Sequence, residues 1–243
     1  GLRSNYITAT WNPASSAKTI AAGTSFVIPL AAGADGSAGL DYSGTTTALG
    51  GLNRPLVLFA PGVVDTTTLG VLDSFAAANE SFVVVDTAAN IAPAAAVTFA
   101  GTLTASASTA VYSPWVWVPD PTSASRDGVA KVPPSGAVAG AILATDASRG
   151  VFKTPAGVEV NVPGVVALER EFTSVELDVL ANGTPPVNAI RIIPGVGPAI
   201  MGGRTLKTTD ATRFINIRRS LNLLTFELHN RLLFAVHRNN DLT

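Results

Sequence analysis

The chain has 243 residues, of which 47% are hydrophobic and only 14% are charged, and its formal net charge is −1. This composition excludes a disordered chain of high charge and low hydropathy, and the near-neutral charge gives no reason to expect a nucleic acid as partner. The sequence contains no cysteine, which excludes disulfides, thiol catalysis and thiolate metal sites together.

The beginning of the chain, residues 1–27, is rich in Ser, Thr, Ala and Asn without a sustained hydrophobic period, which predicts an irregular segment. Further on, the stretch from Thr87 to Pro119 carries no charge, but prolines, serines and threonines interrupt it. A transmembrane helix needs about 20 mostly apolar residues, and this stretch is too polar to qualify. No signal peptide is visible at the start either, so we expect no membrane insertion.

The clearest unit of the sequence is a strand, a helix and a second strand. Pro55–Ala60 is a continuous apolar run of strand length, and Phe82–Asp86 is another. Between them, Asp65 is a suitable N-cap for a helix over Thr66–Asn79. Because neither strand alternates polar and apolar residues, the pattern predicts a parallel βαβ unit that is covered on both faces.

The middle of the chain continues the alternation of strands and helices. A third strand is expected at Ala110–Val118, and a helix of small residues is expected to run to about Thr145 with Ser135 as its N-cap. Gly136 and Gly140 are expected to let this helix pack close to the sheet.

Three more elements are expected before the final helix. They are a helix near Ser174–Leu180, a strand at Val187–Ile193 and an extended stretch at Pro198–Thr205. The sequence therefore predicts an α/β fold with a mixed, largely parallel sheet that is flanked by helices, followed by a C-terminal portion that contains a helix.

The last predicted element is a long helix from about Arg213 to His237. One set of its apolar residues forms a stripe, and a second set points well away from it. The stripe comprises Phe214, Ile217, Leu221, Leu224, Leu228 and Leu232, and the second set comprises Ile215, Phe226 and Leu233. A helix that is apolar on two sides needs two covers, so we expect one cover to come from a further C-terminal segment or from another subunit.

The residues offer little for catalysis. The candidates for a Ser/His/Asp triad are Ser25, which lies in a segment that superficially resembles the serine segment of subtilisins, Asp86 at the end of a strand, and His229 or His237, the only histidines of the chain. Both histidines lie among leucines and arginines of the final helix, and no Gly-x-Ser-x-Gly turn is present. We therefore predict that the protein is not an enzyme, and we assign no catalytic residue.

Binding sites for cofactors are equally weak. Gly197–Thr205 resembles a phosphate loop, but Gly203 stands where the lysine must be, so a turn into a strand is the better interpretation. The two histidines and scattered acids have no zinc-ligand spacing. The arginines of the final helix are expected to form ion pairs at a subunit or domain contact, and they are Arg213, Arg218, Arg219, Arg231 and Arg238. No cofactor or metal is expected.

A series of short motifs, in this order, resembles the sheath proteins of contractile bacteriophage tails over about residues 28–240. They are Leu30–Gly36, Ala60–Gly62, the strand that ends at Asp86, Pro114-Trp115, Val118–Pro121, Val132–Gly140, Thr145-Asp146, Arg149–Lys153, Pro155-Ala156, Gly203–Leu206 and Phe214–Arg219.

The resemblance implies a subtilisin-like α/β core without catalytic residues. It divides the chain into an irregular segment at 1–27, a sheath core domain at 28–160 and a C-terminal sheath domain at 161–243. The family pattern normally continues well beyond the final helix and begins with an N-terminal arm. The resemblance therefore implies a fragment that lacks both terminal arms, which in the family link neighbouring subunits.

The resemblance also implies a function. Sheath subunits assemble as stacked sixfold rings around an inner tail tube, and contraction, which the baseplate triggers, drives the tube through the bacterial envelope. The implied partners are further copies of the chain, the tube protein, the baseplate and the tail terminator. The implied location is the virion, with the host cytoplasm during assembly. Two alternatives remain: a sheath from a related contractile injection or type VI secretion machine and, more remotely, an α/β hydrolase.

Overall fold

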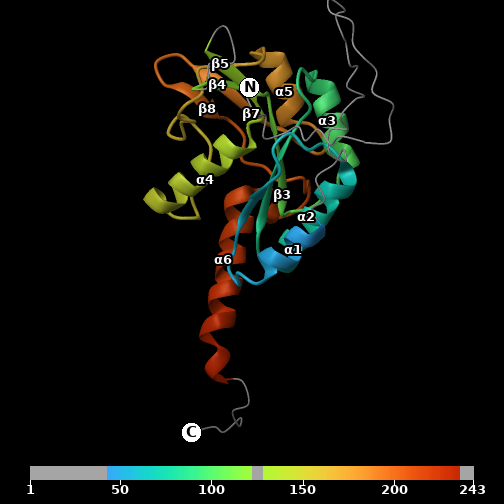
Figure 1. Cartoon of the computed structure of the whole chain (residues 1–243), viewed down its shortest axis with the longest axis vertical. Coiled ribbons are helices and arrows are strands. Elements are labelled where there is room, and N and C mark those ends of the chain that lie inside the picture. The colour runs from blue at the N-terminus through green and yellow to red at the C-terminus, as the bar shows by residue number, and fades with distance from the viewer. Residues whose placement is uncertain (1–42, 122–127, 236–243) are drawn as a thin grey trace, which may run out of the picture. The chain divides into compact units, whose positions relative to one another are not determined.

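The computed structural model describes residues 43–121 and 128–235 (Figure 1). The irregular segment predicted at 1–27 and the motif at Leu30–Gly36 lie outside the described residues. In the described part of the chain, no helix is long and apolar enough to cross a bilayer.

The predicted βαβ unit is confirmed. Strand β1 (Val57–Phe59) and strand β2 (Phe82–Asp86) pair in parallel, and helix α2 (Thr66–Ala78) connects them. The N-cap of α2 is Asp65, whose carboxylate accepts a hydrogen bond of 2.8 Å from the backbone N–H of Thr68.

The main sheet has five strands in the order β1-β2-β3-β7-β8. Strand β3 (Thr109–Ser113) is parallel to β2 and to β7 (Asn188–Ile193), whereas β8 (Gly197–Ile200) returns antiparallel to β7. The fold is therefore the predicted α/β class with a mixed, largely parallel sheet.

Both faces of this sheet are covered. Helices α2, α3 (Pro93–Thr102) and α5 (Ser174–Ala181) pack on one face, with α1 (Ser43–Gly50) beside α2. Helix α4 (Ser135–Arg149) and the start of α6 (Ile215–Arg231) pack on the other. In β2, Phe82 and Val84 face α4, while Val83 and Val85 face α2. Because both faces are buried, the strand is apolar throughout.

One predicted strand is wrong in its extent. Ala110–Val118 is two strands in two sheets, because β3 ends at Ser113 and β4 (Val116–Pro119) joins a second sheet in the order β5-β4-β6. Pro114 lies between them and has no N–H to continue the ladder of β3. The second sheet is antiparallel and includes β5 (Val129–Val132) and β6 (Ala167–Leu168).

Two expectations about α4 are also wrong. Ser135 is the first residue of the helix and not its N-cap, which is Pro134. Gly136 and Gly140 are exposed. A Cβ built on Gly140 has no atom within 4 Å, and one on Gly136 would make only an ordinary contact with Phe59 of β1 (3.6 Å), so the packing of the helix on the sheet does not require a glycine at either position. Helix α3 was not predicted, since its residues are uncharged and have no polar face, although Pro93 at its start is a helix signal.

The later elements match the prediction closely. Helix α5 begins with a complete capping box between Thr173 and Glu176, and β7 and β8 follow it. Two short 3₁₀ turns flank α6, at Ala211–Arg213 and Leu233–Ala235. The main sheet takes strands from both sides of residue 160, and the domain boundary there stays a prediction from the sequence.

Candidate functional site

Asp86, which was considered as the acid of a hydrolase triad, anchors a helix. It lies at the end of β2, fully buried, and its carboxylate accepts bonds from the Ser135 hydroxyl (2.6 Å), the Ser135 N–H (2.7 Å) and the Gly62 N–H (3.0 Å). Burial raises the pKa of Asp86, and the hydrogen bonds from Ser135 and Gly62 oppose that shift. A carboxylate in this position stabilises the first turn of α4.

Of the triad candidates, the structure describes Asp86 and His229, and it does not bring these two together. His229 is exposed on α6, and no hydrogen bond or ion pair links it to Asp86. Ser25 and His237 lie outside the described residues. In the described part of the chain, His, Asp and Glu side chains form no cluster of three or more that could hold a metal ion.

The segment that resembles a phosphate loop has another structural role. Residues Gly197–Ile200 form β8, and Gly202 lies so close to Asn188 that a Cβ there would collide with it. The Asn188 side chain donates to the carbonyls of Val111 and Arg204 and accepts from the N–H of Arg204 (2.8 Å). The segment is therefore part of the main sheet and packs against β7.

Helix α6 is attached to the body of the fold through its first half. Its buried residues are Ile215, Arg219 and Asn222, which are spaced four and three apart and so share one side of the helix. Arg219 forms a bidentate ion pair with Asp146 of α4, with one contact of 2.8 Å. Asn222 donates to the carbonyl of Ser81 (3.2 Å).

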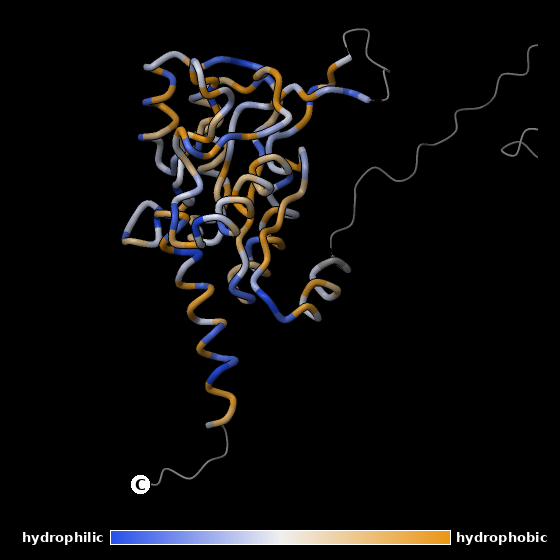
Figure 2. The backbone as a smooth tube through the Cα atoms, turned by 90° about the vertical axis from the view of Figure 1, so that its left-hand side faces the viewer, coloured by the Kyte–Doolittle hydropathy of each residue, from blue (hydrophilic) through white to orange (hydrophobic). Residues whose placement is uncertain are grey.

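The predicted apolar stripe lies on the opposite side of α6, because each residue turns the helix by about 100°. Its leucines are half-exposed: Leu221 43%, Leu224 53%, Leu228 48% and Leu232 52%. Figure 1 shows the second half of α6 extending from the sheet, and in Figure 2 apolar and polar turns alternate along it. We call these four leucines the leucine face. Within the described residues nothing covers it.

The arginines that the sequence assigned to the final helix have different partners. Arg219 pairs with Asp146 of α4, whereas Arg231 pairs with Glu227 one turn away (3.0 Å), and ion pairs at a subunit or domain contact stay a prediction. Arg213 lies over the ring of Phe214, 4.9 Å from its centroid, and the Nε of Arg218 is buried without a hydrogen bond. Arg238 lies outside the described residues.

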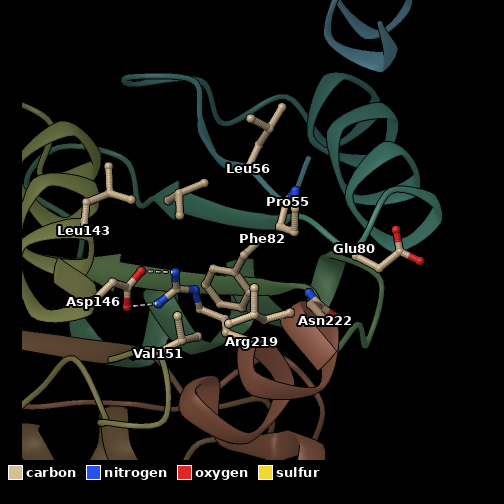
Figure 3. A pocket seen from close by; sticks show the side chains of 11 residues that line it. Pro55, Leu56, Glu80, Phe82, Leu143, Asp146, Val151, Arg219 and Asn222 are labelled. Carbon is tan, nitrogen blue, oxygen red and sulfur yellow. Dashed lines mark hydrogen bonds and ion pairs between the residues drawn. The ribbon is translucent and has the colours of Figure 1, made fainter. Parts of the chain in front are cut away.

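A cavity of about 200 Å³ adjoins the Asp146–Arg219 pair. Figure 3 shows Arg219 reaching toward Asp146, with apolar side chains around the same space. Those side chains belong mainly to Pro55, Leu56, Val57, Phe82, Leu143 and Val151. The cavity is partly open to solvent, as the 54% exposure of Leu143 shows, so the side chains that line it beside α6 are not closely packed.

Sequence reasoning placed Asp146 and Arg219 in two separate motifs but did not pair them. The sequence does indicate that this arginine is buried, because the spacing of Ile215, Arg219 and Asn222 puts them on the same side of the helix. A buried arginine requires a partner, and the partner could be named only from the fold.

No protein-family model and no curated protein sequence matches this chain. Several solved structures are similar to it. The anti-feeding prophage (AFP) helical sheath in its contracted state is 26% identical, with a TM-score of 0.64 over 83% of this chain and 54% of that chain. The sheath complex of the extracellular contractile injection system PVC, also contracted, is 27% identical, with a TM-score of 0.64 over 76% and 49%.

A third similar structure belongs to a baseplate. The AFP baseplate, sixfold symmetrised, contains a chain that is 27% identical, with a TM-score of 0.61 over 83% of this chain and 53% of that chain. This chain thus spans about half the length of the chains that it matches.

Fold and surface together define a protein whose exposed apolar helix is suited to contact with other chains. In fold and sequence the chain is similar to chains of contractile sheaths and baseplates, in agreement with the sheath resemblance of its motifs.

Proposed function

We propose that the protein is a structural subunit of a contractile sheath, assembled as stacked sixfold rings around an inner tube and contracting to drive that tube through a bacterial envelope. The observation that supports this most directly is the fold match to a helical sheath, which extends over 83% of the chain. The leucine face agrees with it, since an apolar surface of this kind marks a site of protein contact.

The machine that we favour is an injection system built like a phage tail. Its support is that the similar structures come from AFP and from PVC. A bacteriophage tail, the first expectation from the sequence, is the alternative, and it would place the protein in a virion that ejects its genome. A type VI secretion sheath is a further alternative.

The proposed partners follow from this role. They are further copies of the chain, an inner tube protein, the baseplate and a terminator that ends the sheath. Assembly takes place in the cytoplasm of the producing cell, and the finished particle acts outside it. The role needs no cofactor, metal, nucleic acid contact or membrane insertion.

A non-enzymatic role is part of the proposal. The chains it resembles are sheath and baseplate components, and Asp86 is occupied by Ser135 and Gly62. A hydrolase would be labelled by a fluorophosphonate probe and would lose that label in Ser25→Ala. We expect no labelling of the wild-type chain.

Negative-stain electron microscopy tests the sheath function. The 243-residue chain and the full product of its gene are each incubated at assembly concentration with and without the tube protein encoded beside it. Striated hollow tubes from the full product are expected. If the full product stays monomeric with its tube protein present, the proposal is wrong.

A further inference from the structure

The attachment of α6 to the body of the fold is largely polar. Of its three buried residues, only Ile215 is apolar, while Arg219 and Asn222 use fixed hydrogen-bond directions to Asp146 and to the carbonyl of Ser81. Apolar contacts tolerate sliding, whereas a bidentate guanidinium–carboxylate pair holds one geometry.

The surroundings of the Asp146–Arg219 pair make its fixed geometry more important. The cavity of about 200 Å³ beside Arg219 is partly open to solvent, so apolar side chains of α4 and of the segment that leads into β1 do not pack fully against α6 there. Close packing there cannot set the angle of the helix by itself, because side chains next to empty space have room to move. The remaining polar determinants are the ion pair, the Asn222 bond and the bond that Asn216, near the start of α6, donates to the carbonyl of Phe152 (3.0 Å).

A buried ion pair contributes little net stability, since desolvation offsets much of the attraction, and well-packed apolar residues often do as well. Its effect on geometry is a separate property. Asp146 is on α4, and the first turn of α4 is anchored to the main sheet by Asp86. The pair thus connects α6 to the sheet through a rigid element.

From these contacts we propose that Asp146 and Arg219 are positioning residues that fix the direction in which α6 presents its leucine face. One consequence of the inference rests on the proposed function: neighbouring sheath subunits would then meet this face at a defined angle. The positioning itself is a property of the single chain.

The test measures the direction of α6 within one chain. Because the sequence has no cysteine, Ser74→Cys on α2 and His229→Cys on α6 give two unique sites for spin labels, both exposed. Double electron–electron resonance, with labelled protein diluted in unlabelled protein, then gives the distribution of distances between them. For the chain that carries only these two cysteine substitutions, we expect one narrow distribution of distances.

The decisive variants are Asp146→Asn, which removes the charge, and the double variant Asp146→Leu with Arg219→Met, which replaces the pair with apolar side chains of similar volume. Both are expected to broaden the distance distribution by about twofold or more, even where the double variant unfolds at the same urea concentration as the wild type. The matched control is Glu227→Gln, which breaks an ion pair within α6 and leaves the distribution unchanged.

A double variant that folds and keeps the narrow distribution would overturn the inference, because the packing of Ile215 and the hydrogen bonds of Asn216 and Asn222 would then suffice without the ion pair. This outcome is distinguishable from failure of the sheath function. The distances are measured on monomers, whereas the sheath function is decided by tube formation.

Discussion

At the scale of single residues, the most informative side chain is Asp86. Its position at the carboxyl end of a parallel strand is where α/β enzymes place functional groups, yet its three hydrogen bonds all go to groups that begin α4 or follow β1. The carboxylate therefore stabilises the junction of helix and sheet.

Asp86→Ala leaves the N–H groups of Ser135 and Gly62 buried without their acceptor. We expect a loss of about 3 kcal/mol in the free energy of unfolding, measured by urea denaturation. Asp86→Asn retains one carbonyl acceptor and is the matched comparison, with a smaller loss. Equal losses for the two variants would show that the hydrogen bonds contribute little.

The pH dependence of Asp86 has a definite sign. Because burial raises its pKa above the ordinary value of 3.8, the folded chain binds more protons than the unfolded chain between 3.8 and the raised pKa. The stability that this group contributes is thus fully present below pH 3.8 and is lost as the pH rises through the raised pKa. The difference in unfolding free energy between wild type and Asp86→Asn should fall over that interval, as urea titrations at several pH values would show.

The exposed carboxylates of Asp210 and Glu176 change the stability with pH in the opposite direction, because their pKa values are lowered. A side-chain hydrogen bond from Thr212 is the main cause that lowers the pKa of Asp210 to about 2, and a backbone N–H lowers that of Glu176. Their contributions are present above their ordinary pKa values and are lost as the pH falls toward the lowered ones. Wild type and Asp86→Asn share the contributions of Asp210 and Glu176, so these contributions cancel in the difference between the two unfolding free energies.

At the scale of elements, local signals in the sequence decide helix starts where the caps are side chains. Helix α5 begins at a capping box in which Thr173 accepts from the N–H of Glu176 and Glu176 accepts from the N–H of Thr173. The helix also buries Leu180 against the main sheet.

Thr173→Ala should lower the free energy of unfolding by about 1 kcal/mol, since it removes the cap acceptor of α5. The urea midpoint measures the change. Thr208→Ala, at an exposed threonine outside the helices, is the control and should leave the midpoint in place. An unchanged midpoint for Thr173→Ala would mean that packing alone holds the helix.

The leucine face gives the second prediction at this scale. Leu224→Lys with Leu228→Lys should change the unfolding free energy by less than about 1 kcal/mol, because both side chains are half-exposed in the single chain. The same variant should abolish tube formation by the full gene product in electron micrographs. His229→Lys, on another side of α6, should preserve the tubes, and tubes formed by the double lysine variant would exclude this face as a subunit contact.

At the scale of the whole described fold, the main sheet depends on distant parts of the sequence. Strand β3 pairs with β7, and the core around Tyr112 also contains Ile190, Ile200 and Ile215. The two sides of residue 160 therefore share one hydrophobic core.

A fragment of residues 41–160 should not fold cooperatively, because it exposes the edge of β3 and one wall of this core. Circular dichroism during urea titration should show a broad, shallow transition, whereas residues 41–243 should show a sigmoidal one. A sharp transition for the shorter fragment would support an independent domain that ends at residue 160.

The sequence by itself determined the α/β class, the βαβ unit, the cap at Asp65 and the helix near Ser174, because each depends on residues that are near one another in the chain. It also determined the apolar stripe of α6 and, through ordered motifs, the similarity to contractile sheath proteins. The tertiary structure alone decided the break at Pro114, the partner of Arg219 and the side of α6 that faces the core. These depend on which surfaces meet, and contacts between residues as distant as Asp146 and Arg219 leave no local pattern in a single sequence.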